Sequence, residues 1–186
     1  MIALKNIEKS FGEKHVLSGV SLALPTGEVT ALMGASGSGK TTLFRILLGL
    51  EVPDAGELVG LEGLRISAVF QEDRLLDRLT AVGNIRFVGG TNAEELLAEL
   101  SLLEETKAVR SFSGGMKRRV ALARALSVPF DLLLLDEPFR GLDENARQAA
   151  AESVLRHSRG KTVLLITHDR REAELLNARI ITLKSE

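Results

Sequence analysis

A glycine-rich segment carries the residues best suited to chemistry, since positions 34–41 read Gly-Ala-Ser-Gly-Ser-Gly-Lys-Thr. The segment follows a strand-like run, residues 28–33, and opens a helix-like run, residues 41–50. In that setting a G-x-x-x-x-G-K-[ST] loop binds nucleotide phosphates, because its backbone N–H groups turn inward and the helix N-terminus adds partial positive charge. The segment therefore predicts a phosphate site. The alternative is a glycine-rich turn that caps an ordinary helix.

Two side chains of this loop have the chemistry that a bound nucleotide requires. The ammonium group of Lys40 is long enough to reach the β- and γ-phosphates, and the hydroxyl of Thr41 suits a magnesium ion. We therefore expect a nucleotide and Mg²⁺ as cofactors. The residues predicted to contact the nucleotide here are Gly34, Ala35, Ser36, Gly37, Ser38, Gly39, Lys40, Thr41 and Thr42.

A second candidate group is a pair of acids at the end of an apolar strand, in the sequence Leu-Leu-Leu-Leu-Asp-Glu at residues 132–137. In open α/β sheets the ligand lies outside the carboxyl ends of the strands, so both acids would reach the crevice of the phosphate loop. Asp136 is placed to hold magnesium, and Glu137, one residue further, lies near an attacking water. Read without the loop, the pair would be a strand that ends in two solvated acids.

Composition limits the class of protein. The chain has 186 residues, of which 45% are hydrophobic, so it can bury one core and is expected to be a single domain. A formal net charge of -1 gives no field that would attract nucleic acid or anionic lipid. No apolar run approaches the roughly 20 residues that span a bilayer, and the N-terminus lacks a signal-peptide pattern. We expect an intracellular protein without disulfides, because cysteine is absent.

The order of strand and helix patterns predicts an α/β fold with a parallel-sheet core. Residues 1–33 contain three β-rich runs, at 2–7, 16–24 and 28–33, which we interpret as an antiparallel group. Residues 72–126 have few β signals, and apolar positions recur at helical spacing in 93–103 and in a helix at 115–126, so we expect a helical subdomain there. The core would comprise residues 34–71 and 127–186, where strands at 65–70, 130–135, 162–167 and 179–183 alternate with helices at 144–157 and 171–176.

From about residue 11 to residue 168, the chain resembles the ATP-binding cassette family. The motifs that carry the resemblance occur in the family's order: Gly34 to Thr41, Gln71, Ser113-Gly114-Gly115, Asp136-Glu137, Gly141-Leu142-Asp143 and His168. The Ser-Gly-Gly signature separates this family from other phosphate-loop ATPases. The resemblance implies that the nucleotide is ATP, and that Ser113, Gly114, Gly115 and Met116 face the γ-phosphate bound to a second subunit. Two chains would then enclose two ATP molecules head to tail.

Ser113 is also a good helix N-cap, so an ordinary cap is the alternative for the tripeptide. The resemblance assigns catalytic roles to His168, as a switch histidine that contacts the γ-phosphate, and to Gln71, which would contact magnesium or its water and couple the site to a membrane partner. A structural histidine and an ordinary strand exit are the alternatives. His15 and His157 have no comparable setting.

Other positions are weaker matches to the family. Phe11 lies where an aromatic ring stacks on adenine, although a phenylalanine is more often part of a core. Asp143 belongs to a loop that crosses the dimer interface, or alternatively caps a helix. Phe112, Met116 and Arg140 depart from the commonest residues at their positions; Met116 is shared by one importer branch. The basic run Lys117, Arg118, Arg119 and Arg124 is expected to be a solvated helix face.

The resemblance implies an ATPase subunit of a transporter, with integral membrane permease subunits as partners and a substrate-binding protein as an indirect one. Residues 71–76, Asn84 and Ser-Gly-Gly-Met are most similar to importers of the nitrate, sulfonate and taurine branch. The protein would be cytoplasmic and peripheral on the inner face of the membrane, would dimerise weakly on ATP, and would bind no nucleic acid. Many relatives continue further past His168. The alternatives are a cassette ATPase of a cell-division or DNA-repair assembly and a nucleotide sensor without hydrolysis.

Overall fold

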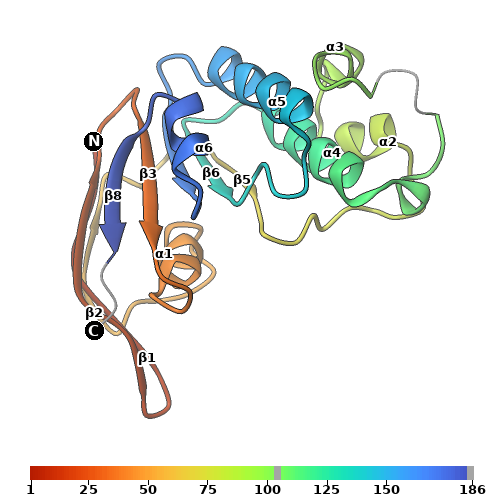
Figure 1. Ribbon diagram of the computed structural model, residues 1–186. Helices are drawn as coiled ribbons and strands as arrows, with labels where there is room; N and C mark the ends of the chain where they lie inside the picture. Colours follow the sequence, from red (N-terminus) through yellow and green to blue (C-terminus); the bar gives the residue numbers. More distant parts are fainter. Residues whose placement is uncertain (103–105, 184–186) are drawn as a thin grey trace.

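A parallel sheet of five strands forms the centre of the protein (Figure 1). In the computed structural model, which describes residues 1–102 and 106–183, the strand order is β5-β6-β7-β3-β8. Strands β6 and β7 are buried along their whole length and consist almost entirely of apolar residues, as parallel strands covered on both faces require. The strands are β3 (Val29–Gly34), β5 (Ile66–Val69), β6 (Leu132–Asp136), β7 (Thr162–Ile166) and β8 (Arg179–Leu183).

A second, antiparallel sheet has the order β2-β1-β4, with β1 (Ile2–Phe11), β2 (Lys14–Leu24) and β4 (Ala55–Val59). The prediction that residues 28–33 belong to this group was wrong, because β3 pairs in parallel with β7 and β8. A strand that leads directly into the phosphate loop and its helix is part of a β-α unit, whose crossover joins parallel strands. The third antiparallel strand is β4, which the sequence analysis did not predict.

The helices lie in two groups. Helix α1 (Lys40–Leu47) follows the phosphate loop, whereas α2 to α5 lie together at the opposite end of the molecule (Figure 1). Helix α5 has the predicted bounds, α3 is shorter than predicted and α2 was not predicted; Leu103, the last residue of the predicted 93–103 stretch, lies outside the described residues. The helices that follow α1 are α2 (Ala81–Phe87), α3 (Ala93–Glu99), a 3₁₀ turn (Val109–Ser111), α4 (Gly114–Leu126), α5 (Glu144–His157) and α6 (Arg170–Leu175).

Two hydrophobic layers hold these elements on the two faces of the parallel sheet. Alternate residues of β6 point to opposite sides: Leu132 and Leu134 pack with α1 and the antiparallel sheet. Leu133 and Leu135 pack with α2 to α6 on the other face. Because both layers share the same strands, the phosphate loop and the helices around α4 are fixed to one frame.

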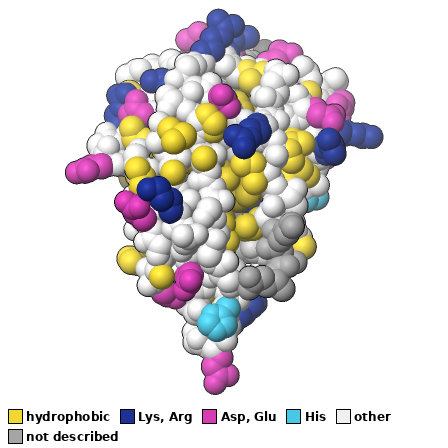
Figure 2. Space-filling model, turned by 90° about the vertical axis from the view of Figure 1, so that its left-hand side faces the viewer, with side chains coloured by type: hydrophobic (Ala, Val, Ile, Leu, Met, Phe, Trp, Pro, Cys, Tyr) yellow, Lys and Arg dark blue, Asp and Glu magenta, His cyan; other side chains and the backbone are white. Residues whose placement is uncertain are grey.

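The outer face of the antiparallel sheet carries acidic and basic side chains interspersed with apolar ones (Figure 2). Lys5 of β1 pairs with Glu57 of β4 at 3.1 Å, and Lys9 of β1 pairs with Asp54, the residue before β4, at 2.9 Å. Exposed pairs of this kind stabilise a protein by at most about 1 kcal/mol each. The sheet is therefore held mainly by its buried inner face.

Candidate nucleotide site

The phosphate loop connects β3 to α1 and surrounds the side chain of Lys40. The Lys40 ammonium group donates to the backbone oxygens of Gly34 at 2.9 Å and Ala35 at 2.7 Å, and lies 3.4 Å from the hydroxyl of Ser38. Gly39 precedes the helix with φ 90°, and a Cβ there would overlap the side chain of Leu17. The loop thus needs glycine at position 39. Its carbonyl groups hold the positively charged end of Lys40 in place.

A cleft of about 470 Å³ opens above the loop, and we call it the phosphate-loop cleft. It brings together five stretches of the chain, residues 11–16, 34–42, 71, 136–137 and 166–168, and the sequence analysis had selected at least one residue in each of them. Ala35 and Ser38 do not line it; Ser38 is buried under the loop. The lining residues are Phe11, Lys14, Val16, Gly34, Ser36, Gly37, Gly39, Lys40, Thr41, Thr42, Gln71, Asp136, Glu137, Ile166 and His168.

Asp136 lies at the floor of this cleft, 3% exposed, at the end of β6. Burial, followed by the neighbouring charge of Glu137, raises the pKa of Asp136 to about 6 from its ordinary value of 3.8, and the charges of Arg118 and Lys40 act in the opposite direction. A buried carboxylate with a raised pKa gains most from a cation. Asp136 is therefore suited to a metal ion more than to a solvated surface.

We predict that Asp136→Asn stabilises the nucleotide-free protein at neutral pH. An acid whose pKa is higher in the folded state begins to destabilise the fold at its ordinary pKa of 3.8, and the full cost is reached above the folded-state pKa of about 6. The gain should therefore be about 2–3 kcal/mol at pH 7 and should decline as the pH falls from 7 to 4. Urea unfolding at both pH values measures it. Asp131→Asn is the matched control with the opposite sign, because hydrogen bonds from Arg65 lower the pKa of Asp131. A loss of stability in Asp136→Asn at pH 7 would contradict the prediction.

Glu137 and His168 face each other across the cleft. Nδ1 of His168 lies 3.2 Å from Oε1 of Glu137, and the His168 side chain is 75% exposed. The backbone of Glu137 has φ 48°, a left-handed conformation that costs a residue with a side chain on the order of 1 kcal/mol. The strained backbone therefore belongs to a residue that is predicted to be catalytic.

Phe11 is 48% exposed at the rim of the same cleft, so it does not belong to either core layer. The ammonium group of Lys9 lies 5.4 Å from the centre of its ring. An exposed ring at the mouth of a polar cleft offers its π-face to a planar ligand. The alternative of core packing for Phe11 was wrong.

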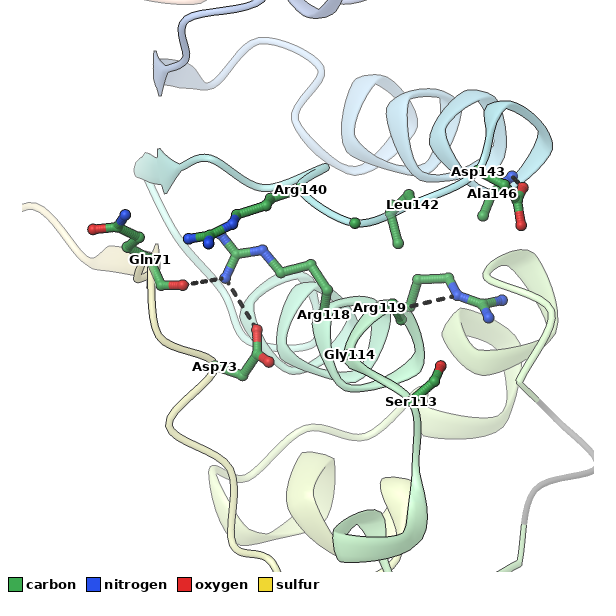
Figure 3. Close-up of a pocket in the computed structure, with 12 residues that line it drawn as sticks. Gln71, Asp73, Ser113, Gly114, Arg118, Arg119, Arg140, Leu142, Asp143 and Ala146 are labelled. Carbon is green, nitrogen blue, oxygen red and sulfur yellow. Dashed lines mark hydrogen bonds and ion pairs between the residues drawn. The ribbon is translucent and has the colours of Figure 1, made fainter. Parts of the chain in front are cut away.

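A second cleft of about 560 Å³ contains the Ser-Gly-Gly segment, and we call it the signature cleft (Figure 3). Ser113 caps α4 by accepting from the Met116 backbone N–H at 3.2 Å. A Cβ on Gly115 would come within 2.9 Å of the Gly141 carbonyl oxygen, so the close approach of the start of α4 to the loop at Gly141 requires glycine. The lining residues are Gln71, Asp73, Ser113, Gly114, Gly115, Arg118, Arg119, Arg140, Gly141, Leu142, Asp143 and Ala146.

Within one molecule the two clefts share only Gln71 among their lining residues. Ser113, Gly114, Gly115 and Asp143 therefore lie away from the phosphate loop of their own chain. Met116 lines neither cleft and packs partly against the helical core layer. Asp143 caps α5 by accepting from the Ala146 N–H at 2.9 Å, which is the alternative that the sequence analysis gave beside a place in the dimer interface.

The sequence analysis missed Arg118. The basic run was expected to be a solvated helix face, but Arg118 is only 3% exposed and its guanidinium donates to backbone oxygens of Phe70, Asp136 and Glu137. A usable signal was its helical spacing, since Arg118 shares a face with the buried Leu122 and Ala125. Phe112, whose packing the sequence left open, is buried in the helical core layer.

Comparison with known proteins decides the family. The family model described as "ABC transporter" matches residues 17–140. The chain belongs to this family. The curated relatives include "Aliphatic sulfonates import ATP-binding protein SsuB 3" of Rhodococcus jostii (strain RHA1), which is 42% identical over 98% of this chain and 70% of the relative. The protein of the same name from Paraburkholderia xenovorans (strain LB400) is 43% identical over 99% and 77%.

Solved structures of the family agree with the ABC ATPase fold described above. "Dimeric structure of a post-hydrolysis state of the ATP-binding cassette MJ0796 bound to ADP and Pi" superposes with a TM-score of 0.87 and 31% identity, covering 100% of this chain and 97% of that chain. "Dimeric Structure of MJ0796, a Bacterial ABC Transporter Cassette" gives 0.85 and 30%, covering 99% and 94%. The predicted fold class is thus confirmed.

These findings make the chain an ATP-binding and hydrolysing subunit of an ABC transporter. They favour this function over the cell-division, DNA-repair and non-hydrolysing alternatives. Among the residues that the structure describes, no helix combines the length and apolar character needed to cross a bilayer.

Proposed function

We propose that two copies of this ABC ATPase bind ATP between them, with the phosphate-loop cleft of each facing the signature cleft of the other. The observation that supports this arrangement is the separation of Lys40 and Ser113 into different clefts of one chain. Both groups suit an anion, because the ammonium is a cation and the start of α4 presents N–H groups beside glycine. A head-to-tail pair would use both halves at each nucleotide.

The side chains of the phosphate-loop cleft fit ATP and magnesium. The ammonium group of Lys40 donates to two loop carbonyls, and its N–H groups can turn to the β- and γ-phosphates when a nucleotide binds. Thr41, Gln71 and Asp136 line the same cleft and supply hydroxyl, amide and carboxylate oxygens, the ligand types that Mg²⁺ prefers. When bound, Mg²⁺ would neutralise charge on the phosphates.

The remaining roles belong to this chain's own acids, bases and loops. Glu137 accepts a proton from the attacking water, and His168, hydrogen-bonded to it, keeps its carboxylate oriented toward the terminal phosphate. Phe11 stacks on the adenine ring. Ser113, Gly114, Gly115 and Met116 close on the γ-phosphate of the partner's nucleotide, and Asp143 lies in the contact between the two chains.

We predict that Glu137→Gln, which should bind ATP and hydrolyse it very slowly, forms a dimer in Mg-ATP and is monomeric without nucleotide. Analytical ultracentrifugation over a range of protein concentrations measures the association. Adding Ser113→Arg to this variant should prevent dimerisation while ATP binding by the monomer persists, because a long side chain then fills the signature cleft. Persistence of a monomer of Glu137→Gln at high concentration in Mg-ATP would contradict the shared site.

We further propose that the protein powers import of an aliphatic sulfonate from the inner face of the membrane, together with separate permease subunits and a substrate-binding protein. The support is that the relatives cited above, which are 42% and 43% identical, are named as sulfonate import subunits. The test reconstitutes the ATPase with its permease in liposomes and adds binding protein loaded with an alkanesulfonate or with nitrate. Stimulation of ATP hydrolysis by the sulfonate alone supports the proposal, and stimulation by nitrate alone contradicts it.

A further inference from the structure

The guanidinium of Arg118 lies between the ends of two neighbouring strands of the parallel sheet, β5 and β6 (Figure 3). On the β5 side it donates to the Phe70 carbonyl at 2.5 Å, the Gln71 carbonyl at 3.4 Å and the Asp73 carboxylate at 3.1 Å. From the β6 side it contacts the carbonyl of Asp136 and, through two nitrogens at 2.6 and 3.1 Å, that of Glu137. One side chain of α4 therefore binds both segments.

Both segments also contribute side chains to the phosphate-loop cleft. Gln71 follows β5 and Glu137 follows β6, and both line that cleft. Glu137 has a left-handed backbone, φ 48°, that the surrounding contacts must maintain. The double hydrogen bond from Arg118 to the Glu137 carbonyl opposes relaxation of this backbone.

Burying the Arg118 guanidinium costs free energy, which a purely structural role would have to offset. The Arg118 side chain is 4% exposed, and its only ion pair in the described part of the chain is with Asp73. A buried ion pair is frequently no more stabilising than apolar residues of similar volume. The planar fork of arginine, however, donates to several acceptors in fixed directions, which lysine or glutamine cannot reproduce.

The same helix begins at the signature segment. Ser113 caps α4, and Arg118 lies one and a half turns further along, so a displacement of the start of α4 also moves the guanidinium. We propose that Arg118 is a positioning residue of the ATPase reaction, which ties the backbones of Gln71 and Glu137 to the signature helix. This inference rests on the proposed roles of Glu137 and Ser113. When the partner's nucleotide binds Ser113 of one chain, Arg118 of that chain thereby aligns Glu137, its general base.

The test compares Arg118→Lys with Arg124→Lys. Arg124 is on the same helix and its guanidinium also donates to backbone oxygens, those of Asp73 and Arg74, but it reaches neither Gln71 nor Glu137. Arg118→Lys should lower kcat for ATP hydrolysis on the order of 100-fold, the loss typical of a misplaced catalytic group, while the Kd for ATP changes less than about threefold. Arg124→Lys should retain kcat within about twofold.

A double mutant separates positioning from general destabilisation. If Arg118 acts through Glu137, adding Arg118→Lys to Glu137→Gln should lower the single-turnover rate no further. If Arg118→Lys does not fold, Arg118→Gln, which avoids a buried unpaired charge, should show a kcat loss of about tenfold and the same lack of additivity. Losses that multiply, or a kcat loss matched by Arg124→Lys, would overturn the proposal. A Glu137→Gln variant that keeps the kcat of the unaltered protein would instead refute the proposed role of Glu137, on which this inference rests.

Discussion

Glu137→Gln is expected to lower kcat for ATP hydrolysis on the order of 1,000-fold, the typical contribution of a general base. The Kd for ATP should change less than about threefold, because glutamine keeps the shape of the side chain while it removes the negative charge and the basicity. Steady-state hydrolysis and equilibrium binding of ATP measure the two quantities. The variant tests the chemical role of Glu137 without disturbing the cleft.

The geometry gives this expectation a physical basis. The Glu137 carboxylate is 24% exposed and contacts His168 at 3.2 Å, whereas Asp136 beside it is buried. The two neighbouring acids thus occupy different environments, and the more accessible carboxylate can reach a water molecule. The guanidinium of Arg140 places a positive charge 3.9 Å from Oε2 of Glu137.

A matched control is Glu174→Gln, which removes an exposed glutamate that pairs with Arg170 at 3.5 Å on α6. Its kcat should equal that of the unaltered protein. If Glu137→Gln retains more than a tenth of the activity, or if it loses ATP affinity in proportion to kcat, then Glu137 is not the general base.

The parts of the site that could be predicted from sequence are those fixed by local patterns. The phosphate loop needs glycine at defined positions, and the run from Leu132 to Asp136 has the composition of a strand buried on both faces. Helix α5 follows a capping aspartate, Asp143, and has the predicted bounds. Such features depend on neighbours in the chain, so a single sequence contains them.

Other features depend on partners that are distant in sequence. Strand β4 pairs with β1, and Gly56 within it permits close approach to the backbone oxygens of Lys5 and Asn6, yet its own residues are mostly exposed and give no alternation. Helix α2 is short, contains Gly83, and is capped by Thr80. Neither element has the strong periodicity from which sequence analysis predicts structure.

Arg118 illustrates the same limit within the site. In the sequence it is the middle of Lys-Arg-Arg, a pattern typical of a solvated helix face, and its burial depends on carbonyl groups at residues 70, 136 and 137. Those acceptors become adjacent only when β5 and β6 pair. The charge is buried because tertiary structure provides oxygens for it, and no local propensity encodes that.

Lys40→Ala should raise the Kd for ATP about 100-fold or more, while the temperature of unfolding changes little. Charged hydrogen bonds contribute about 1.5–3 kcal/mol each, so losing the contact of one ammonium with two phosphates accounts for the effect. The fold should persist because the acceptors that Lys40 leaves behind, the Gly34 and Ala35 carbonyls, lie at a cleft that water can enter. Fluorescent-nucleotide titration and thermal unfolding measure both quantities.

Two further variants decide between charge and geometry as the origin of this affinity. Lys5→Ala removes an exposed lysine that pairs with Glu57 outside the cleft, and it should leave the Kd unchanged. Lys40→Arg keeps the positive charge, but a planar guanidinium cannot occupy the space of an ammonium that lies 2.7–2.9 Å from two loop carbonyls, so affinity should remain low. If Lys40→Arg binds ATP normally, charge alone determines binding. If Lys40→Ala binds normally, the loop is not the phosphate site.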